Sequence, residues 1–375
     1  MTTSVPRFAA LDVFRGMTII FMIIVNSPGN YDTTYSLLLH ADWNGFTPTD
    51  LVFPSFLFAV GNAMSFVIKK WESLKPSKVL IKIFKRSFII FLLGFLMYWY
   101  PFFKFDASNN IISFPIEETR ILGVLQRIAL CYLVAALIIW YLKPRVSFII
   151  GIILLFVYWM LLYAFGDAGQ ELTLTGNSVL KFDLWLMGEN HLYHGEGIPF
   201  DPEGWLSTLP GIVNVIAGYL AGLYIQKKGV TYEAITKLLM IGFALVFIGY
   251  VWDLNFPINK KLWTSSFVVY TVGLDCIIIA TLMYFIEFNR YKGWTNFFQI
   301  VGKNPLIIYL FSEILLITLF TIKMGNGLSL QAWLYENIFR HTGAYFGSLL
   351  FALSLTMLCW ALGWYMDKKK IYIRV

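Results

Sequence analysis

Residues 146–166 read VSFIIGIILLFVYWMLLYAFG, a stretch without a single charged side chain. A helix rises about 1.5 Å per residue, so a run of about 20 apolar residues crosses the hydrocarbon core of a bilayer. The rest of the chain matches this stretch: 58% of its 375 residues are hydrophobic, only 14% are charged, and the mean hydropathy is +0.68. Soluble domains carry about 25% charged residues. The composition therefore excludes a soluble protein of this length.

Nine further stretches of similar length and composition accompany this one. The sequence therefore predicts an all-α fold, a polytopic membrane helix bundle of about ten transmembrane helices in a lipid bilayer. No soluble domain separates the stretches, so residues 1–375 are expected to form a single transmembrane domain. The predicted spans are residues 11–28, 50–68, 80–100, 120–142, 146–166, 206–226, 235–253, 263–286, 299–322 and 345–366.

The basic residues fall mainly in every second loop, which places them on one side of the membrane and sets the expected orientation. Cytoplasmic loops of membrane proteins carry an excess of Lys and Arg. Both termini are therefore predicted to be cytoplasmic, and the net charge of +7 follows from topology without a nucleic-acid partner. The basic residues of this side lie at Arg7 and in 69–86, 143–145, 227–228, 290–292 and 368–374.

His40 is the strongest candidate for chemistry. It lies in a polar island, Leu39 to Asp50, between two apolar spans on the predicted outer side. Histidine exchanges protons near neutral pH, so it can act as a general base. An interfacial polar residue beside Trp43 is the alternative interpretation. Asp50 opens the next span, where it can cap the helix or orient His40 by accepting its second ring N–H.

Polar side chains inside the spans are the next candidates, because ionisable groups in a membrane are costly. Asn26 lies near the outer end of the first span, where its amide can donate to a developing oxyanion. Asp12 and Arg15 are three residues apart, which predicts an ion pair on one helix face. The three cysteines of the chain lie in apolar spans without metal-type spacing and are interpreted as packing residues.

Two groups of residues are candidates for binding a phosphorylated cofactor. Arg120 and Arg127 are seven residues apart, which on a helix places both guanidinium groups on one face, with Gln126 beside them. Their alternative partners are carboxylates of other spans, whereas phosphate is the functional partner. Lys303 and Asn304 start a later span, and they become the second choice for the cofactor, after the arginines, through the family resemblance described below.

The long outer loop supplies candidates for substrate binding. Asp201 and Glu203 precede Trp205 at the start of a helix, a pattern that suits a polar sugar-like or cationic ligand and equally a capped helix start. His191 and His194 have a spacing that binds a metal only if a third ligand converges, so no metal is expected.

The motifs together resemble one family in order along essentially the whole chain. The resemblance is to the transmembrane part of heparan-α-glucosaminide N-acetyltransferase and its bacterial relatives. The motifs that carry it are Phe8-Ala9-Ala10-Leu11-Asp12-Val13-Phe14-Arg15-Gly16, Val25-Asn26, His40-Ala41-Asp42-Trp43-Asn44-Gly45, Asp50-Leu51-Val52-Phe53-Pro54, Gly123-Val124-Leu125-Gln126-Arg127 and Asp201-Pro202-Glu203-Gly204.

The resemblance implies a transmembrane acyltransferase domain that moves an acetyl group from cytosolic acetyl-CoA to the amine of a glucosamine-type sugar on the far side. It places the active histidine at His40 and the neighbouring asparagine at Asn26. Trp43 and Asn44 belong to the same motif and are expected, with Asp201 and Glu203, to bind the acceptor. The resemblance is closer to the bacterial branch, which implies a small amino-sugar acceptor and the bacterial cytoplasmic membrane.

The residues leave several alternatives open. Transfer can be direct, with His40 as general base, or can pass through an acetyl group held on His40. A membrane O-acyltransferase of a polysaccharide would use the same inventory of His and Arg. A transporter also accounts for ten spans with buried charges, although no pair of matching Gly- or Pro-broken spans is visible. A homodimer stays open too, because an exposed apolar surface is expected of any membrane protein.

Overall fold

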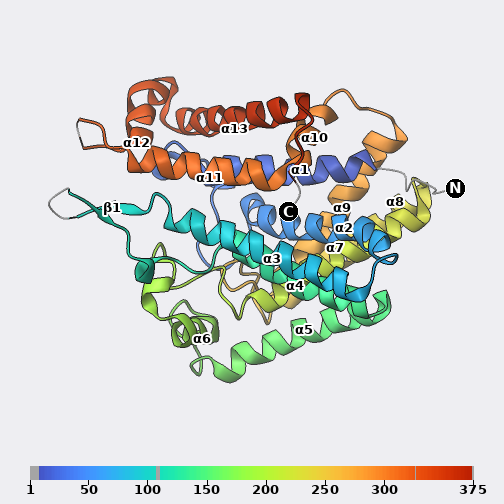
Figure 1. Cartoon of the computed structure of the whole chain (residues 1–375). Coiled ribbons are helices and arrows are strands. Elements are labelled where there is room, and N and C mark those ends of the chain that lie inside the picture. The colour runs from blue at the N-terminus through green and yellow to red at the C-terminus, as the bar shows by residue number, and fades with distance from the viewer. Residues whose placement is uncertain (1–7, 107–109, 326, 374–375) are drawn as a thin grey trace.

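Long helices occupy the ten predicted stretches and pack side by side into one bundle (Figure 1). The computed structural model describes residues 8–106, 110–325 and 327–373; Arg7 and Arg374 lie outside them. The helices in the first half are α1 (Ala9–Asn26), α2 (Val52–Trp71), α3 (Pro76–Trp99), α4 (Val124–Tyr141) and α5 (Pro144–Phe165). Those in the second half are α7 (Thr208–Lys228), α8 (Tyr232–Asp253), α9 (Ser265–Met283), α10 (Thr295–Lys303), α11 (Pro305–Thr321) and α13 (Ala344–Lys368).

The described helices confirm a polytopic membrane protein. Eight of them are long and apolar enough to cross a membrane, and the bent pair α10 and α11 makes a ninth if it counts as one span. The one predicted span that is not among these nine is α3. It is 24 residues long, but its first half carries four basic residues, Lys78, Lys82, Lys85 and Arg86. Long Lys and Arg side chains near a helix end can reach the bilayer surface while their stems stay in the apolar region.

The span predicted at 299–322 was wrong in one respect, because it consists of two helices. α10 ends at Lys303, α11 begins at Pro305, and their axes differ by 84°. Proline has no N–H to donate and disfavours the helical conformation of the residue before it. Asn304 accordingly has φ −131° and ψ 51°, outside the helical region.

The start predicted at residue 120 for the fourth span was also early. Residues 120–123 are not helical, and α4 begins at Val124. Arg120 and Arg127 therefore do not share a helix face, although their spacing had suggested one.

Short elements between the spans are further differences from the prediction. These are the strands β1 (Phe103–Phe105) and β2 (Ile111–Ser113), which pair antiparallel, the helix α6 (Ser178–Met187), and the single turns η3 (Pro48–Leu51) and η5 (Glu189–His191).

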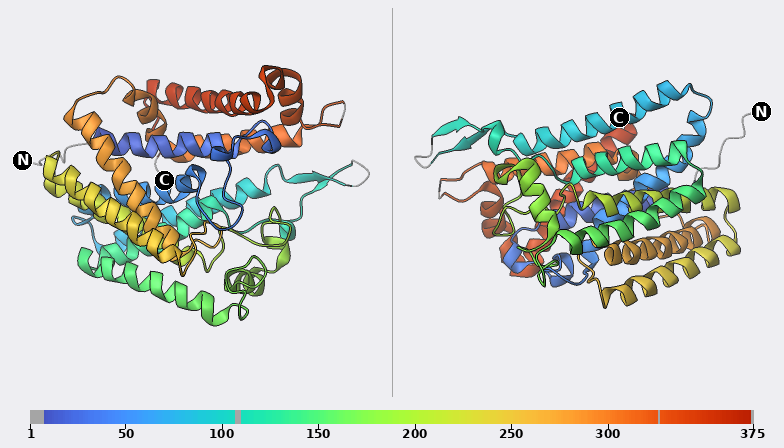
Figure 2. Two further views of the ribbon diagram at one scale, coloured as in Figure 1. Left: turned by 180° about the vertical axis from the view of Figure 1, so that it is seen from behind. Right: turned by 90° about the horizontal axis from the view of Figure 1, so that it is seen from below.

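The loops gather at the two ends of the bundle, and the longer ones share one end. The β1–β2 hairpin, α6 and α12 (Leu330–Leu334) all lie at this end, away from the N-terminus (Figures 1 and 2). Hydrogen bonds join its loops, from Gly45 N to Ile258 O at 2.8 Å and from Ile121 N to His191 O at 3.2 Å. We call it the His40 end.

The opposite end carries the short turns and the first residues of α1. Arg15 Nε donates to Gly302 O at 2.8 Å, and Lys303 Nζ lies 2.7 Å from Asp367 Oδ1 near the end of α13. The start of α1 and the end of α13 therefore lie together. The predicted pair is also present, with Arg15 Nη2 3.1 Å from Asp12 Oδ1. We call this the Lys303 end.

Candidate active site

His40 and Asp50 form the centre of the His40 end. The Nδ1 atom of His40 lies 2.7 Å from Oδ1 of Asp50, which is wholly buried, while the His40 side chain is 38% exposed. A carboxylate accepts only a proton-bearing nitrogen, so the proton of the neutral ring lies on Nδ1. The other ring nitrogen, Nε2, is then free to accept a proton. This is the arrangement that a general base needs.

The local sequence explains why Asp50 is held so firmly. Oδ2 of Asp50 accepts hydrogen bonds from Thr47 N at 2.9 Å, Thr47 Oγ1 at 3.1 Å and Ala41 N at 3.2 Å. Thr47 and Asp50 form a capping box at the start of η3, directly before α2. Both expected roles of Asp50 therefore coexist: it caps the turn that starts the span and accepts the ring N–H of His40.

A lysine faces the other side of the His40 ring. Lys260 Nζ lies 3.1 Å from Nε2 of His40 and 3.5 Å from Nδ1. Burial, and then the charge of Lys260, lower the pKa of His40 from its usual value, against the opposite effect of Asp50. Burial is also the main cause that lowers the pKa of Lys260, and the charges of Glu203 and Asp50 oppose it. The lowered pKa of His40 favours its neutral imidazole.

Arg120 is bound by carboxylates of the same chain. Its Nε donates to Asp201 Oδ2 at 2.8 Å, and its Nη2 donates to Asp201 Oδ1 at 2.6 Å and to Glu203 Oε2 at 2.7 Å. Its guanidinium also lies against the rings of Tyr98 and Tyr193, 4.9 and 4.8 Å from their centres. The structure thus pairs residues that the sequence had suggested for two ligands, Arg120 for the cofactor and the two acids for the acceptor.

Glu203 joins this ion-pair cluster to His40. Burial acts to raise the pKa of Glu203, but the charges of Arg120, Lys260 and Arg127 outweigh it, and the net pKa is lowered. Glu203 is also close enough to act on the charge of His40. Both acids expected to bind the acceptor are therefore buried against Arg120, with Asp201 1% and Glu203 8% exposed, and Glu203 also acts on the charge of His40.

Asn26 lies at the last turn of α1, as predicted, and its amide has a partner in α11. Asn26 Nδ2 donates to Oε1 of Glu313 at 3.2 Å, and Tyr31 OH donates to the Asn26 carbonyl at 3.4 Å. One N–H of the amide remains for another acceptor. Within the described part of the chain, the partner of the Asn26 side chain is Glu313 and not His40. Glu313 in turn acts electrostatically on Tyr98, which contacts Arg120.

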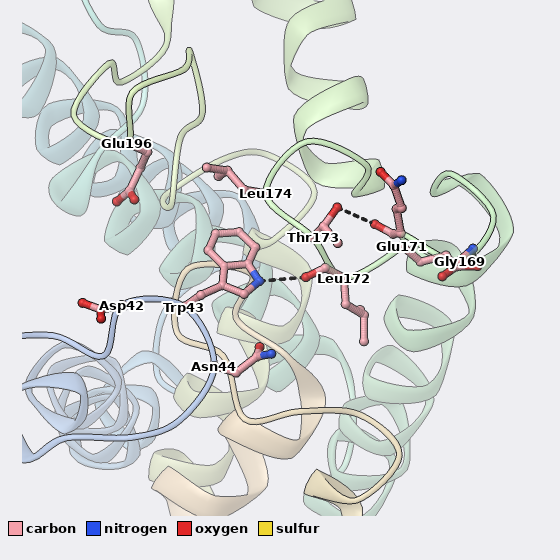
Figure 3. Close-up of a pocket in the computed structure, with 10 residues that line it drawn as sticks. Asp42, Trp43, Asn44, Gly169, Glu171, Leu172, Thr173, Leu174 and Glu196 are labelled. Atoms are coloured by element: carbon pink, nitrogen blue, oxygen red, sulfur yellow. Dashed lines mark hydrogen bonds between the residues drawn. The ribbon is translucent and has the colours of Figure 1, made fainter.

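A cleft of about 490 Å³ opens beside the His40 loop. Trp43 lies in it, with Asp42 and Glu196 to one side and Glu171 to the other in the view of Figure 3. The indole Nε1 of Trp43 donates to Leu172 O at 2.8 Å, which fixes the ring. Asn44 also lines the cleft, and its Oδ1 accepts from Asn259 Nδ2 at 3.1 Å. An aromatic ring among carboxylates suits a cationic ligand.

Gln126 and Arg127 are completely buried in the first turns of α4. Arg127 Nη2 donates to Gly204 O at 3.2 Å and to the Ser207 hydroxyl, and the guanidinium stacks 4.8 Å from the centre of the Trp263 ring. Arg127 Nε and Nη1 and both polar atoms of the Gln126 amide have no hydrogen-bond partner among the residues that the structure describes. Buried polar groups of this kind are usually satisfied by water or a ligand.

Lys303 and Asn304 lie at the opposite end from the other cofactor candidates. Lys303 Nζ is 2.7 and 2.8 Å from the two oxygens of Asp367. Asn304 Nδ2 donates to Ile371 O at 2.9 Å, and its Oδ1 accepts from Ile373 N at 3.0 Å. The five residues proposed for one cofactor therefore fall into two groups with different partners.

His191 has a structural contact. Nδ1 of His191 donates to Thr119 O at 2.7 Å, which ties η5 to the segment before α4. Among the residues that the structure describes, no group of three or more His, Cys, Asp or Glu side chains converges as a metal site.

Lys260 lies at the candidate site although it was not predicted from the sequence, and Glu313, visible in the sequence as an acid in an apolar span, was given no role there. Lys260 and Lys261 lie together in the predicted outer loop between α8 and α9, against the rule that Lys and Arg gather inside. That exception was a visible signal. Glu313 is an acid in an apolar span, which by itself marks a candidate. Neither signal names the partner, because His40 and Lys260 are 220 positions apart.

These features define the chain as a polytopic membrane protein with a histidine–carboxylate pair at one end of its bundle. The family model described as heparan-alpha-glucosaminide N-acetyltransferase, catalytic, matches residues 7–252, more than half of the chain. The protein therefore belongs to this family, as its motifs had indicated. The matched range includes Asn26, His40 and Asp50, whereas Lys260 and Glu313 lie beyond it.

Two relatives support the assignment. The heparan-alpha-glucosaminide N-acetyltransferase of Mus musculus is 28% identical over 382 residues, which cover 84% of this chain and 54% of that protein. The protein of the same name from Homo sapiens is 27% identical over 376 residues, which cover 82% of this chain and 53% of that protein. The chain thus spans about half the length of these curated relatives.

Proposed function

We propose that the protein is a transmembrane N-acetyltransferase that moves the acetyl group of acetyl-CoA to the amine of a glucosamine-type sugar. The observation that carries the proposal is the His40–Asp50 pair, 2.7 Å apart, in a loop whose next residues, Asp42 to Asn44, line the cleft. The name of the mouse and human relatives gives the reaction and the acceptor class that we carry over.

The proposed reaction uses His40 as a general base. The acceptor amine attacks the carbonyl carbon of the thioester, and Nε2 of His40 takes the proton that the nitrogen loses. The carbon–sulfur bond then breaks, and the sulfur leaves as a thiolate that takes up a proton. The products are an N-acetyl sugar and free coenzyme A. Asp50 stabilises the imidazolium that forms, and the remaining N–H of Asn26 is the proposed donor to the oxyanion.

The acidic cleft is the proposed site for the acceptor. Trp43 offers an aromatic face, Asn44 offers an amide, and Asp42 and Glu171 give the cleft a negative charge that attracts a sugar ammonium. Because the amine reacts only as the free base, the ammonium has to lose a proton before attack. This proton goes to solvent. Glu203, whose charge acts on His40, is kept as a proposed acceptor residue, whereas Asp201, which accepts two hydrogen bonds from Arg120, is assigned to that arginine.

The donor is assigned to the other cationic residues. Lys303 and Asn304 are proposed for the charged nucleotide end, at the expense of the ion pair with Asp367. The polar atoms of Gln126 and Arg127 that lack hydrogen-bond partners are buried. We assign them to the amide groups of the narrow arm of coenzyme A rather than to a phosphate. Arg120 is removed from the donor site, because Asp201 and Glu203 already occupy its guanidinium.

The proposal also includes the orientation of the protein in the membrane. We propose that the Lys303 end faces the cytoplasm and the His40 end the outside of a bacterial cytoplasmic membrane, on the basis of the basic loops at the Lys303 end. The residues 1–375 are proposed to act as one domain, since Asn26 and Glu313 join α1 to α11.

This function can be tested in sealed vesicles. Vesicles in which the protein faces inward are first separated from those in which it faces outward. Labelled acetyl-CoA on the side of the Lys303 end and glucosamine on the other side should give N-acetylglucosamine on the glucosamine side. Glucose serves as the matched acceptor without an amine, and acetylated glucose would favour O-acyl transfer instead.

A transporter is the second candidate, favoured by the broken helix at Asn304 and Pro305. Transporters with such helices have a matching break in each half, and the described residues hold one bent pair. Movement of unmodified glucosamine, with no acetylated product, would replace the proposed acetyl transfer with transport.

A further inference from the structure

Lys260 is the cation nearest to the reactive nitrogen of His40. It comes from the loop between α8 and α9, beyond the range that the family model matches. Its Nζ lies 3.1 Å from Nε2, and among the described residues it forms no ion pair with a carboxylate. Its neighbour Lys261 does form one, with Nζ 2.5 Å from Glu196 Oε2. Two adjacent lysines therefore have different surroundings, and only one of them is directed at His40.

Two opposing influences act on the His40 ring. The hydrogen bond and negative charge of Asp50 favour the imidazolium, which cannot accept a proton. A cation on the other side of the ring disfavours the imidazolium, because two positive charges would then lie about 3 Å apart. The charged groups that act on His40 are Asp50, Lys260 and Glu203, and burial and Lys260 together outweigh the two acids.

We infer that Lys260 is a positioning residue of the proposed reaction: its ammonium, directed at Nε2, holds His40 in the unprotonated form that accepts the proton of the acceptor amine. Asp50 alone would orient the ring and also encourage its protonation. Asp50 and Lys260 together give a ring that is oriented and still basic. The inference rests on the proposed function, since it assigns Lys260 a task in that reaction.

The arriving acceptor has to replace the hydrogen bond from Lys260 to Nε2. The groups that act on Lys260 are Glu203 and Asp50, which attract its ammonium, and Lys261 and Arg127, which repel it. Glu203 thus offers the displaced ammonium a partner on the same side of the ring. A sugar ammonium that enters beside His40 meets the same two acids, so the acceptor amine takes the position that Lys260 occupies in the free protein.

The test measures the protonation of His40 directly. Diethyl pyrocarbonate acylates neutral imidazole, and mass spectrometry of the peptide that contains His40 gives its rate of modification at each pH. In Lys260→Met and Lys260→Gln, the midpoint of this profile should move to higher pH by about one pH unit, because the cation that opposed protonation is gone. Lys260→Arg keeps the charge and should keep the wild-type midpoint.

Lys181→Met is the matched control, since Lys181 lies in α6 at the same end and is paired with Asp167 at 2.6 Å. It should leave the His40 profile unchanged. The acid limb of kcat/KM for acetyl transfer should move with the modification midpoint in each variant. A structural role for Lys260 would lower kcat without moving either profile.

The inference is overturned if the Met and Gln variants keep the wild-type midpoint, if the midpoint moves to lower pH, or if the Arg variant moves as the Met variant does. Failure of the proposed function is a separate result. Wild-type protein that carries out no transfer would remove the reaction, while the modification profiles would still decide what Lys260 does to His40.

Discussion

The two ends of the bundle both hold cations beside carboxylates, but they use them differently. At the His40 end, Arg120 is 15% exposed and bound by the buried acids Asp201 and Glu203, while Lys260 faces a histidine. At the Lys303 end, Lys303 pairs with Asp367, and both side chains are about one-fifth exposed, at 22% and 20%. The type of residue is therefore a poor guide to its task, and the partner and the burial decide it.

The largest expected difference between the two ends is a loss of folding stability in the Arg120→Ala variant of the His40 end. Loss of this guanidinium leaves two buried carboxylates facing each other, which costs about 3–5 kcal/mol of folding free energy. Chemical unfolding in detergent measures it. Arg340→Ala is the control, because Arg340 forms an exposed pair with Glu336 four residues earlier and should change stability by less than about 1 kcal/mol.

Arg120→Ala protein that is as stable as wild type but binds acetyl-CoA weakly would contradict this result. It would return Arg120 to the donor site, where its sequence pattern had first suggested it.

The sequence was sufficient for the parts of the molecule that depend on local patterns. Span positions follow from runs of apolar residues, and the His40–Asp50 contact joins residues only ten positions apart, in one short loop. The sequence could not supply contacts that depend on the packing of distant segments. Arg120 contacts Asp201 across 81 positions. The spacing of Arg120 and Arg127 predicts a shared face only if residues 120–123 are helical, and in the structure α4 begins at Val124.

The Lys303 end should give a smaller effect, in binding rather than in folding. Lys303→Ala is expected to raise KM for acetyl-CoA about tenfold, since a charge-assisted contact with phosphate contributes about 1.5–3 kcal/mol. KM for the acceptor and kcat should stay the same. Lys228→Ala is the matched control, a lysine of the same end whose exposed partner is Glu233.

An unchanged KM for acetyl-CoA in folded Lys303→Ala protein would assign Lys303 to its ion pair with Asp367. The donor site would then have to be sought elsewhere at the Lys303 end.

The smallest effect concerns Asp183 in α6, at the His40 end. Burial first, and then the charge of Asp201, raise the pKa of Asp183 to about 7. A carboxyl whose pKa is raised by folding stabilises the protein while it is protonated, and this contribution is lost as pH rises from the ordinary value of about 4 through 7. Asp183→Asn should remove this loss, so its thermal midpoint should exceed that of wild type at pH 8 and match it near pH 4.

Equal slopes of the thermal midpoint against pH for wild type and Asp183→Asn would show that Asp183 is ionised in the folded protein. Its Oδ1 atom accepts Trp205 N at 3.0 Å, a bond that an Asn carbonyl can keep, so the comparison isolates the charge.

The transfer rate of His40→Ala protein tests the central claim most directly. His40 is half exposed in a loop, so the variant should fold and bind acetyl-CoA as wild type does. Labelled acetyl-CoA and glucosamine, supplied on opposite sides of sealed vesicles, should give a rate about 10²–10⁴ below wild type, the usual loss for a general base. If wild-type protein without acceptor also retains label that the variant does not, His40 carries the acetyl group. Turnover by the folded variant above about a third of wild type, far more than the loss of a general base allows, would contradict the account.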